Sequence, residues 1–259
     1  ARPWSDKTRL YNEKKLLGLY LSGHPMDAYK AEAARYTRGL TISNMQPGDA
    51  KHPRAVKIAG VVASSNMRLS KKNDGSKFYI VTLDDSTGTF EAAFFGQKAL
   101  RYQEILEERE KNSKARHGRG VKQEGEDQPS PLILVVDGLL FMDGDGMPKL
   151  RVQDLNSLEE LRCRQARALR LKFTEKDLSE NSDKVCALLE EDCVDAGELR
   201  KRAAMSEEPE KEPHGCRLDL MVGGSMASIG SGSRVFLPTD RLIDGIRDIA
   251  GSAAVKVVY

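Results

Sequence analysis

The spacing of apolar residues changes along this chain, and that change limits the folds it can adopt. Between residues 10 and 21, Leu10, Leu17, Tyr20 and Leu21 follow the three-to-four-residue spacing of an amphipathic helix. From residue 56 the apolar residues begin to alternate with other residues, which is the period of a β-strand. The sequence therefore predicts a helical start followed by β structure.

Glycine and proline predict where the helical start ends. Gly23 can adopt the left-handed conformation that closes a helix, and Pro25 cannot continue one. We therefore expect the first helix to end just before Gly23. A weaker second helix is predicted over residues 27–36, and residues 37–54 form a connector rich in glycine and proline. Residues 1–54 thus make a helical segment and connector.

The next region has the element order of a known barrel. Three strands are predicted at residues 56–63, 78–83 and 89–95, with a hairpin turn at 84–88 and a helix over residues 99–109. Two further strands, 132–141 and 149–155, precede a short helix that begins after Ser157 and runs to about Gln165. This order matches the OB-fold, a five-stranded barrel. We assign residues 55–165 to it.

Two other segments complete the organisation. Residues 110–130 are hydrophilic and contain glycine, serine and proline, which predicts a mobile insertion in the barrel. Residues 166–259 read as a third region of short strands and helices, with a final helix that Thr239 caps and Gly251 ends. The expected fold class is mixed β and α+β: a helical N-terminal segment, a five-stranded OB-fold barrel and a small α+β C-terminal domain.

The charge of the chain is concentrated in one place. The total is only +2, which excludes the whole-chain basicity of a general nucleic-acid coat protein. Residues 51–77, however, hold seven basic residues and one acidic residue, a local charge of +6. Such cations can follow a phosphate backbone, although they could also form a solvated edge and loop. The candidate nucleic-acid-binding residues are Lys57, Arg68, Lys71, Lys72, Lys77, Phe78 and Arg151.

The aromatic part of this candidate site is small. If Val81 and Leu83 face the core, Phe78 faces outward as the obvious base-stacking side chain of the second strand. The third strand contributes Glu91, whose carboxylate would repel phosphate.

Patterns for catalysis, metal binding or a membrane span are missing from the sequence. The adjacent acids Asp84 and Asp85 suit a hairpin turn better than a two-metal site. The four cysteines lack the close pairing of zinc ligands, and we expect them to be reduced thiols. We expect no metal, no cofactor and no catalytic residue. The longest apolar run, residues 131–142, is too short to span a bilayer, and the missing signal core and initiator methionine suggest a cytoplasmic protein cut from something longer.

Three segments resemble a known family. They are EKKLLGLYLSGHP at residues 13–25, TLDDSTGTFE at residues 82–91 and RVFLPTDRLI at residues 234–243. In this order and spacing they resemble the C-terminal region of bacterial replicative DNA polymerase III alpha subunits, including the OB domain and the domain that binds the tau subunit of the clamp loader.

The resemblance implies a role in DNA replication. The polymerase aspartates and their Mg²⁺ would lie upstream, so this piece would be the non-catalytic end of a DNA-directed DNA polymerase, and the sliding clamp would be contacted only through upstream residues. The OB barrel would bind single-stranded template DNA, and residues 166–259 would bind tau. The candidate tau-binding residues are Arg234, Phe236, Arg241, Leu242 and Ile246.

Two other functions fit an OB barrel. One is a free-standing single-stranded nucleic-acid-binding protein, and the other is the anticodon-binding module of a tRNA synthetase.

Overall fold

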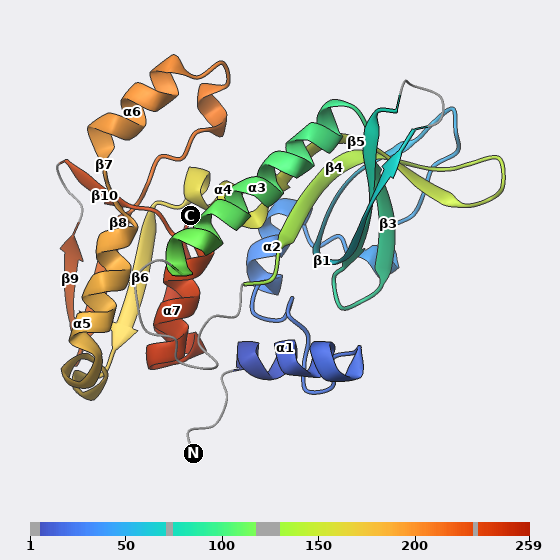
Figure 1. Ribbon diagram of the computed structural model, residues 1–259. Helices are drawn as coiled ribbons and strands as arrows, with labels where there is room; N and C mark the ends of the chain where they lie inside the picture. Colours follow the sequence, from blue (N-terminus) through green and yellow to red (C-terminus); the bar gives the residue numbers. More distant parts are fainter. Residues whose placement is uncertain (1–5, 71–74, 118–129, 230–232) are drawn as a thin grey trace. The chain divides into compact units, whose positions relative to one another are not determined.

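The computed structural model of the protein describes residues 6–70, 75–117, 130–229 and 233–259 (Figure 1). The chain forms two compact units, residues 1–158 (unit 1) and 159–259 (unit 2). The division falls seven residues before the expected boundary at 165, and the side chain of Arg162 is bonded to Pro238 and Asp240 within unit 2. Among the described helices, none is long and apolar enough to cross a membrane.

Unit 1 begins with the helices α1 (Asp6–Leu17) and α2 (Lys30–Thr37), followed by the 3-10 turn η1 (Ile42–Asn44). The predicted end of the first helix, before Gly23, is wrong. Gly18 adopts a left-handed φ of +76°, and its N–H donates to the carbonyl of Lys14. The chain then folds back, so that the Leu21 and Ser22 N–H groups donate to the Glu13 carboxylate.

Five antiparallel strands form the sheet of unit 1. They are β1 (Arg54–Leu69), β2 (Lys77–Asp84), β3 (Thr89–Phe94), β4 (Ile133–Met142) and β5 (Pro148–Ser157). Their order in the sheet is β3-β2-β1-β4-β5, because the long strand β1 pairs with β4 through its first half and with β2 through its second half. The described parts of β3 and β5 touch without forming a hydrogen-bonded ladder, so the barrel is not closed. The order of elements confirms the predicted OB-like fold.

Helix α3 (Gln97–His117) follows β3 and precedes β4 in the chain, and it packs on the sheet. Its buried Tyr102 and Ile105 join Val81, Leu83 and Phe94 in the core of unit 1. Residues 110–117 continue this helix, which corrects the prediction that they belong to a mobile insertion. Residues 118–129 of that prediction lie outside the described residues.

Unit 2 contains a four-stranded sheet in the order β11-β6-β8-β9, with β6 and β8 parallel. Its strands are β6 (Ala168–Phe173), β8 (Arg217–Val222), β9 (Ser225–Ile229) and β11 (Val255–Val258). A separate pair joins β7 (Cys193–Asp195) and β10 (Arg234–Phe236). The helices are α4 (Leu158–Gln165), α5 (Glu175–Glu191), α6 (Ala196–Met205) and α7 (Asp240–Ala250), and the 3-10 turns are η2 (Pro209–Lys211) and η3 (Ser252–Ala254).

The core of unit 2 lies between one face of the sheet and the helices α5 and α7. Leu169, Leu171 and Leu218 reach it from the sheet, while Leu242 and Ile246 reach it from α7. The predicted start and end of α7 are confirmed. The Thr239 hydroxyl accepts the Leu242 N–H at 3.2 Å, and Gly251 takes a φ of +87° at the other end.

Candidate nucleic-acid interface

Side chains of β2 and β3 alternate between the core and the outer face of the sheet. Val81 and Leu83 are fully buried, so Phe78 and the other residues of its parity lie on the outer face. On β3, Phe94 points into the core and Glu91 is exposed. The predicted facing of both strands is therefore confirmed.

Phe78 is not the lone aromatic residue of this face. Its ring stacks on that of Phe95, with centroids 4.9 Å apart and an angle of 21° between the ring planes. Phe95 follows the last residue of β3 and is 59% exposed. Phe95 is not among the residues predicted from the sequence, although the inward position of Phe94 implies that the next residue points outward.

A cation continues this aromatic pair across the sheet. Arg68 on β1 lies directly opposite Phe78 on β2, so Arg68, Phe78 and Phe95 form a row across the sheet, which we call the aromatic row. Lys77 is exposed next to Phe78 in the chain, but it has the parity of Val81 and Leu83 and so lies on the other side of β2. Stacked rings beside cations are the combination with which proteins bind single-stranded nucleic acid.

The acidic residue of this face lies away from the aromatic row. Glu91 pairs with Thr82, which is four residues, or roughly 13 Å of strand, from Phe78. On its other side Thr82 pairs with Ser64 of β1, and the hydroxyls of these two residues lie 2.8 Å apart. The expected repulsion of phosphate by Glu91 therefore acts at one end of the face.

Two of the predicted binding residues lie elsewhere. Lys57 forms an ion pair of 2.7 Å with Asp137, and about 35 Å of strand separates it from Arg68 on β1. Arg151 on β5 places its guanidinium 5.6 Å from the ring centre of Phe141 on β4. The structure thus brings Arg68 and Phe78 together on one face, with Lys77 next to Phe78 in the chain, but it places Lys57 and Arg151 elsewhere. Lys71 and Lys72 lie outside the described residues.

Most of the predicted tau-binding residues are internal to unit 2, which corrects their assignment to a contact surface. Phe236, Leu242 and Ile246 are buried in the core, because the apolar stripe of α7 packs on the sheet. Arg241 is ion-paired with Glu191 and with Asp192, the latter at 2.6 Å. The side chain of Arg234 is exposed on β10.

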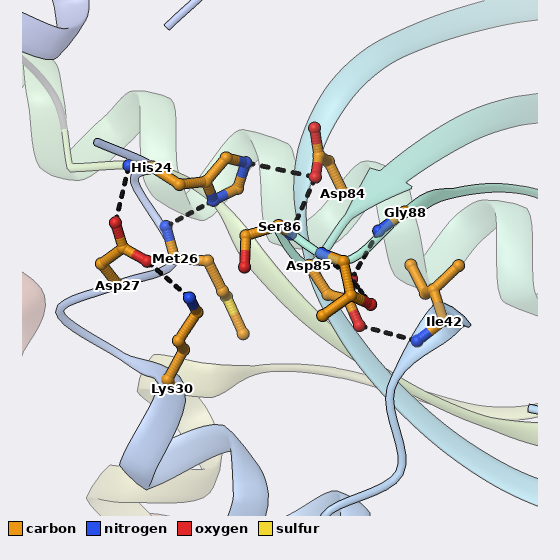
Figure 2. A network of polar contacts seen from close by, with 10 residues as sticks. His24, Met26, Asp27, Lys30, Ile42, Asp84, Asp85, Ser86 and Gly88 are labelled. Carbon is orange, nitrogen blue, oxygen red and sulfur yellow. Dashed lines mark hydrogen bonds and ion pairs between the residues drawn. The ribbon is translucent and has the colours of Figure 1, made fainter. Parts of the chain in front are cut away.

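Two of the segments that carry the family resemblance meet in unit 1 (Figure 2). His24 Nε2 lies 3.1 Å from Asp84 Oδ1 at the end of β2. The carboxylate of Asp85 accepts the backbone N–H groups of Ile42 at 2.7 Å, Thr87 at 2.8 Å and Gly88 at 3.1 Å. The hairpin-turn interpretation of the adjacent acids is therefore confirmed, since Asp85 organises this turn and binds it to η1.

Asp27 fixes the other side of this network. Its carboxylate accepts the His24 N–H at 2.7 Å and pairs with Lys30 at 2.7 Å. The hydrogen bond with Lys30 and that with the His24 backbone hold the pKa of Asp27 below its usual value. The turn that carries His24 is thereby attached to the start of α2.

Comparisons with known proteins point to one group of relatives. The chain is 26% identical to the DNA polymerase III subunit alpha of Escherichia coli strain K12 over 263 residues, which cover all of this chain and 19% of that protein. It is 32% identical to the same subunit of Pseudomonas fluorescens over 179 residues, 69% of this chain and 13% of that protein. The chain thus spans about a fifth or less of the relatives it matches, and no family model matches it.

Solved structures with some likeness include an OB-fold domain and a protein bound to DNA. The second OB-fold domain of replication protein A from Methanococcus maripaludis aligns with 46% of this chain and 94% of its own, at 15% identity and a TM-score of 0.27. RecG bound to a three-way DNA junction aligns with 61% of this chain and 18% of its own, at 12% identity and a TM-score of 0.25.

Proposed function

Because this chain is related to the carboxy-terminal part of the bacterial DNA polymerase III alpha subunit, we propose that its OB-like sheet binds single-stranded template DNA during replication. The observation that carries the proposal is the aromatic row of Arg68, Phe78 and Phe95. The exposed ring of Phe95, stacked on Phe78, offers an aromatic surface to a base, and Arg68 offers a charge to the phosphates. The chain would contribute no catalytic residue, metal or cofactor of its own to the polymerase, and would act in the cytoplasm.

Binding of a fluorescent oligo-dT to the whole chain tests this proposal. Phe78→Ala and Phe95→Ala should each weaken binding by roughly tenfold, because stacking contributes about 1–3 kcal/mol per base. Leu100→Ala is the matched control, since Leu100 is an equally exposed apolar residue on α3. Equal affinity of all three variants and the unaltered chain would rule out the aromatic row as the binding surface.

The salt dependence of the same titration tests whether Arg68 contacts a phosphate of the bound DNA. Arg68→Ala should lower the affinity and reduce the slope of log affinity against log salt by about 0.7, the value for one phosphate contact on a single strand. Arg151→Ala provides the comparison, because Arg151 lies on Phe141, away from the aromatic row. A loss confined to Arg151→Ala would move the site to β4 and β5.

We further propose that unit 2 attaches the polymerase to the tau subunit of the clamp loader. This proposal is supported by the relation to the alpha subunit, and of the five candidate residues it now relies on the exposed Arg234. Arg234→Glu should reduce retention of the whole chain on immobilised tau, whereas Lys201→Glu on the exposed side of α6 should not. Failure of the unaltered chain to bind tau would refute this part of the proposal.

A further inference from the structure

The sheet of unit 2 has a basic face opposite its helices. Alternation along the strands sends Leu169, Leu171 and Leu218 toward α5 and α7 and turns their neighbours to the other side. The charged residues on that other side are Arg170, Lys172, Arg217, Asp219 and Lys256. Four cations and one carboxylate give the described part of this surface, which we call the basic sheet face, a charge of +3.

Asp219 holds the two arginines of this face in place. Its carboxylate is 1% exposed and accepts hydrogen bonds from Ser228 Oγ at 2.7 Å and Arg217 Nε at 3.1 Å, with Arg170 at 3.5 Å. These bonds, that with Ser228 foremost, lower the pKa of Asp219. Because Ser228 belongs to β9, the shared carboxylate keeps the Arg217 guanidinium beside that strand.

Strand β9 is an open edge next to β8, the strand that carries Arg217. It ends the sheet order, and Figure 1 shows it at the outer margin of the sheet. All five residues of β9 are exposed, including Met226 at 60% and Ile229 at 48%. Its sequence SMASI contains none of the lysine or proline residues that usually protect a strand edge from pairing.

We propose that an extended acidic segment of a partner protein adds to β9 as a further strand. Backbone hydrogen bonds to the open edge would give register, Arg217 and Lys172 would attract its carboxylates, and Met226 would contact its apolar side chains. The described residues of the basic sheet face include no aromatic ring, which favours an acidic peptide over single-stranded nucleic acid. This inference goes beyond attachment to tau, because it concerns the chemistry of the segment whichever protein carries it.

Peptides of defined pattern test strand addition on the whole chain. The probe is a fluorescent ten-residue peptide of alternating glutamate and valine, compared with an alternating lysine and valine peptide and with ten-residue oligo-dT. Two further versions of the acidic peptide carry N-methyl groups on odd or on even residues, which keeps the charge but blocks one set of backbone donors. We expect the acidic peptide to bind, and the lysine peptide and at least one N-methylated peptide to bind at least tenfold more weakly.

Charge reversal locates the site. Arg217→Glu with Lys172→Glu should weaken binding of the acidic peptide at least tenfold, and Lys172→Glu with Lys256→Glu should weaken it by less, without disturbing the Asp219 bonds. The matched control is Lys201→Glu with Arg202→Glu, two exposed basic residues on α6. Binding unaffected by both charge reversals, or equal binding of both N-methylated peptides and their parent, would overturn the proposal. So would no binding of the acidic peptide at millimolar concentration, or binding of oligo-dT alone at this face. Tau retention is measured separately, so either proposal can fail without the other.

Discussion

His24 Nε2 lies 3.1 Å from Asp84 Oδ1, and this contact joins the turn before α2 to the end of β2. The Nδ1 atom of the same ring accepts the Met26 N–H at 3.0 Å, which assigns the ring proton of the neutral imidazole to Nε2, facing the carboxylate. Nε2 has no hydrogen-bond partner of good geometry within the described residues, so the contact with Asp84 is mainly electrostatic. Residues sixty positions apart in the chain are thus coupled.

A double-mutant cycle measures this coupling. We expect His24→Ala and Asp84→Asn each to lower the free energy of unfolding of unit 1. The double variant should lose about 0.5–1 kcal/mol less than the sum of the two single losses, because both side chains are partly buried. The free energy of unfolding of the whole chain in urea provides the measurement. Strict additivity of the two substitutions would show that the contact contributes nothing.

Asp85 should contribute more to the stability of unit 1 than Asp84 does. Asp85→Ala leaves the buried Ile42 N–H without its acceptor and releases the Thr87 and Gly88 N–H groups. We expect a loss of about 3 kcal/mol in urea unfolding, since hydrogen bonds to charged groups in buried sites are the costly ones to break. Asp49→Ala is the control, because Asp49 accepts the Lys51 and His52 N–H groups in an exposed turn and should lose less than about 1 kcal/mol. Equal losses would contradict the expected role of burial.

Gly138 is required by the close approach of β4 and β5. A Cβ atom at this position would lie 2.5 Å from the carbonyl oxygen of Arg151, where the pairing of the two strands shifts register. Gly138→Ala should therefore lower the free energy of unfolding of unit 1, measured in urea, by about 2 kcal/mol or more. Gly144→Ala, where a Cβ meets nothing within 4 Å, should leave stability almost unchanged. A similar loss at both positions would show that the close approach to Arg151 does not determine the cost of the substitution.

The stability of unit 2 should fall as the pH rises from about 4.5 to 7. Burial, and then the negative charge of Asp240, raise the pKa of Glu159 to about 7. Between its unfolded and folded pKa values the folded unit holds a proton that the unfolded chain has released, so each step up in pH favours unfolding. The full difference, about 3 kcal/mol, is reached above pH 7.

Hydrogen exchange of amides in β6 and β8 at pH 5 and pH 8 reports this change, once corrected for intrinsic exchange rates. Glu159→Gln removes the titrating group and should abolish the dependence, whereas Glu207→Gln at an exposed position should keep it. Stability that stays constant or increases across this window in the unaltered chain would contradict the raised pKa.

Local patterns in the sequence were sufficient for most of the fold. The alternation around Val81 and Leu83, the turn residues after Asp84 and the cap at Thr239 each depend on near neighbours in the chain, and the structure confirms them. The end of α1 at Gly18 was missed, because apolar spacing continues through Leu21 although the backbone does not. Helical spacing of apolar residues shows which residues could share one face of a helix, but it does not show where the helix ends.

The sequence by itself determined the element order, the inward and outward faces of the strands and the resemblance to a polymerase subunit, because these follow from neighbours in the chain. Only the tertiary structure decided which side chains meet. It placed Phe95 on Phe78, paired Lys57 with Asp137 and buried Leu242 and Ile246 in unit 2. Strand register and helix packing set these contacts, and both depend on residues far apart in the sequence.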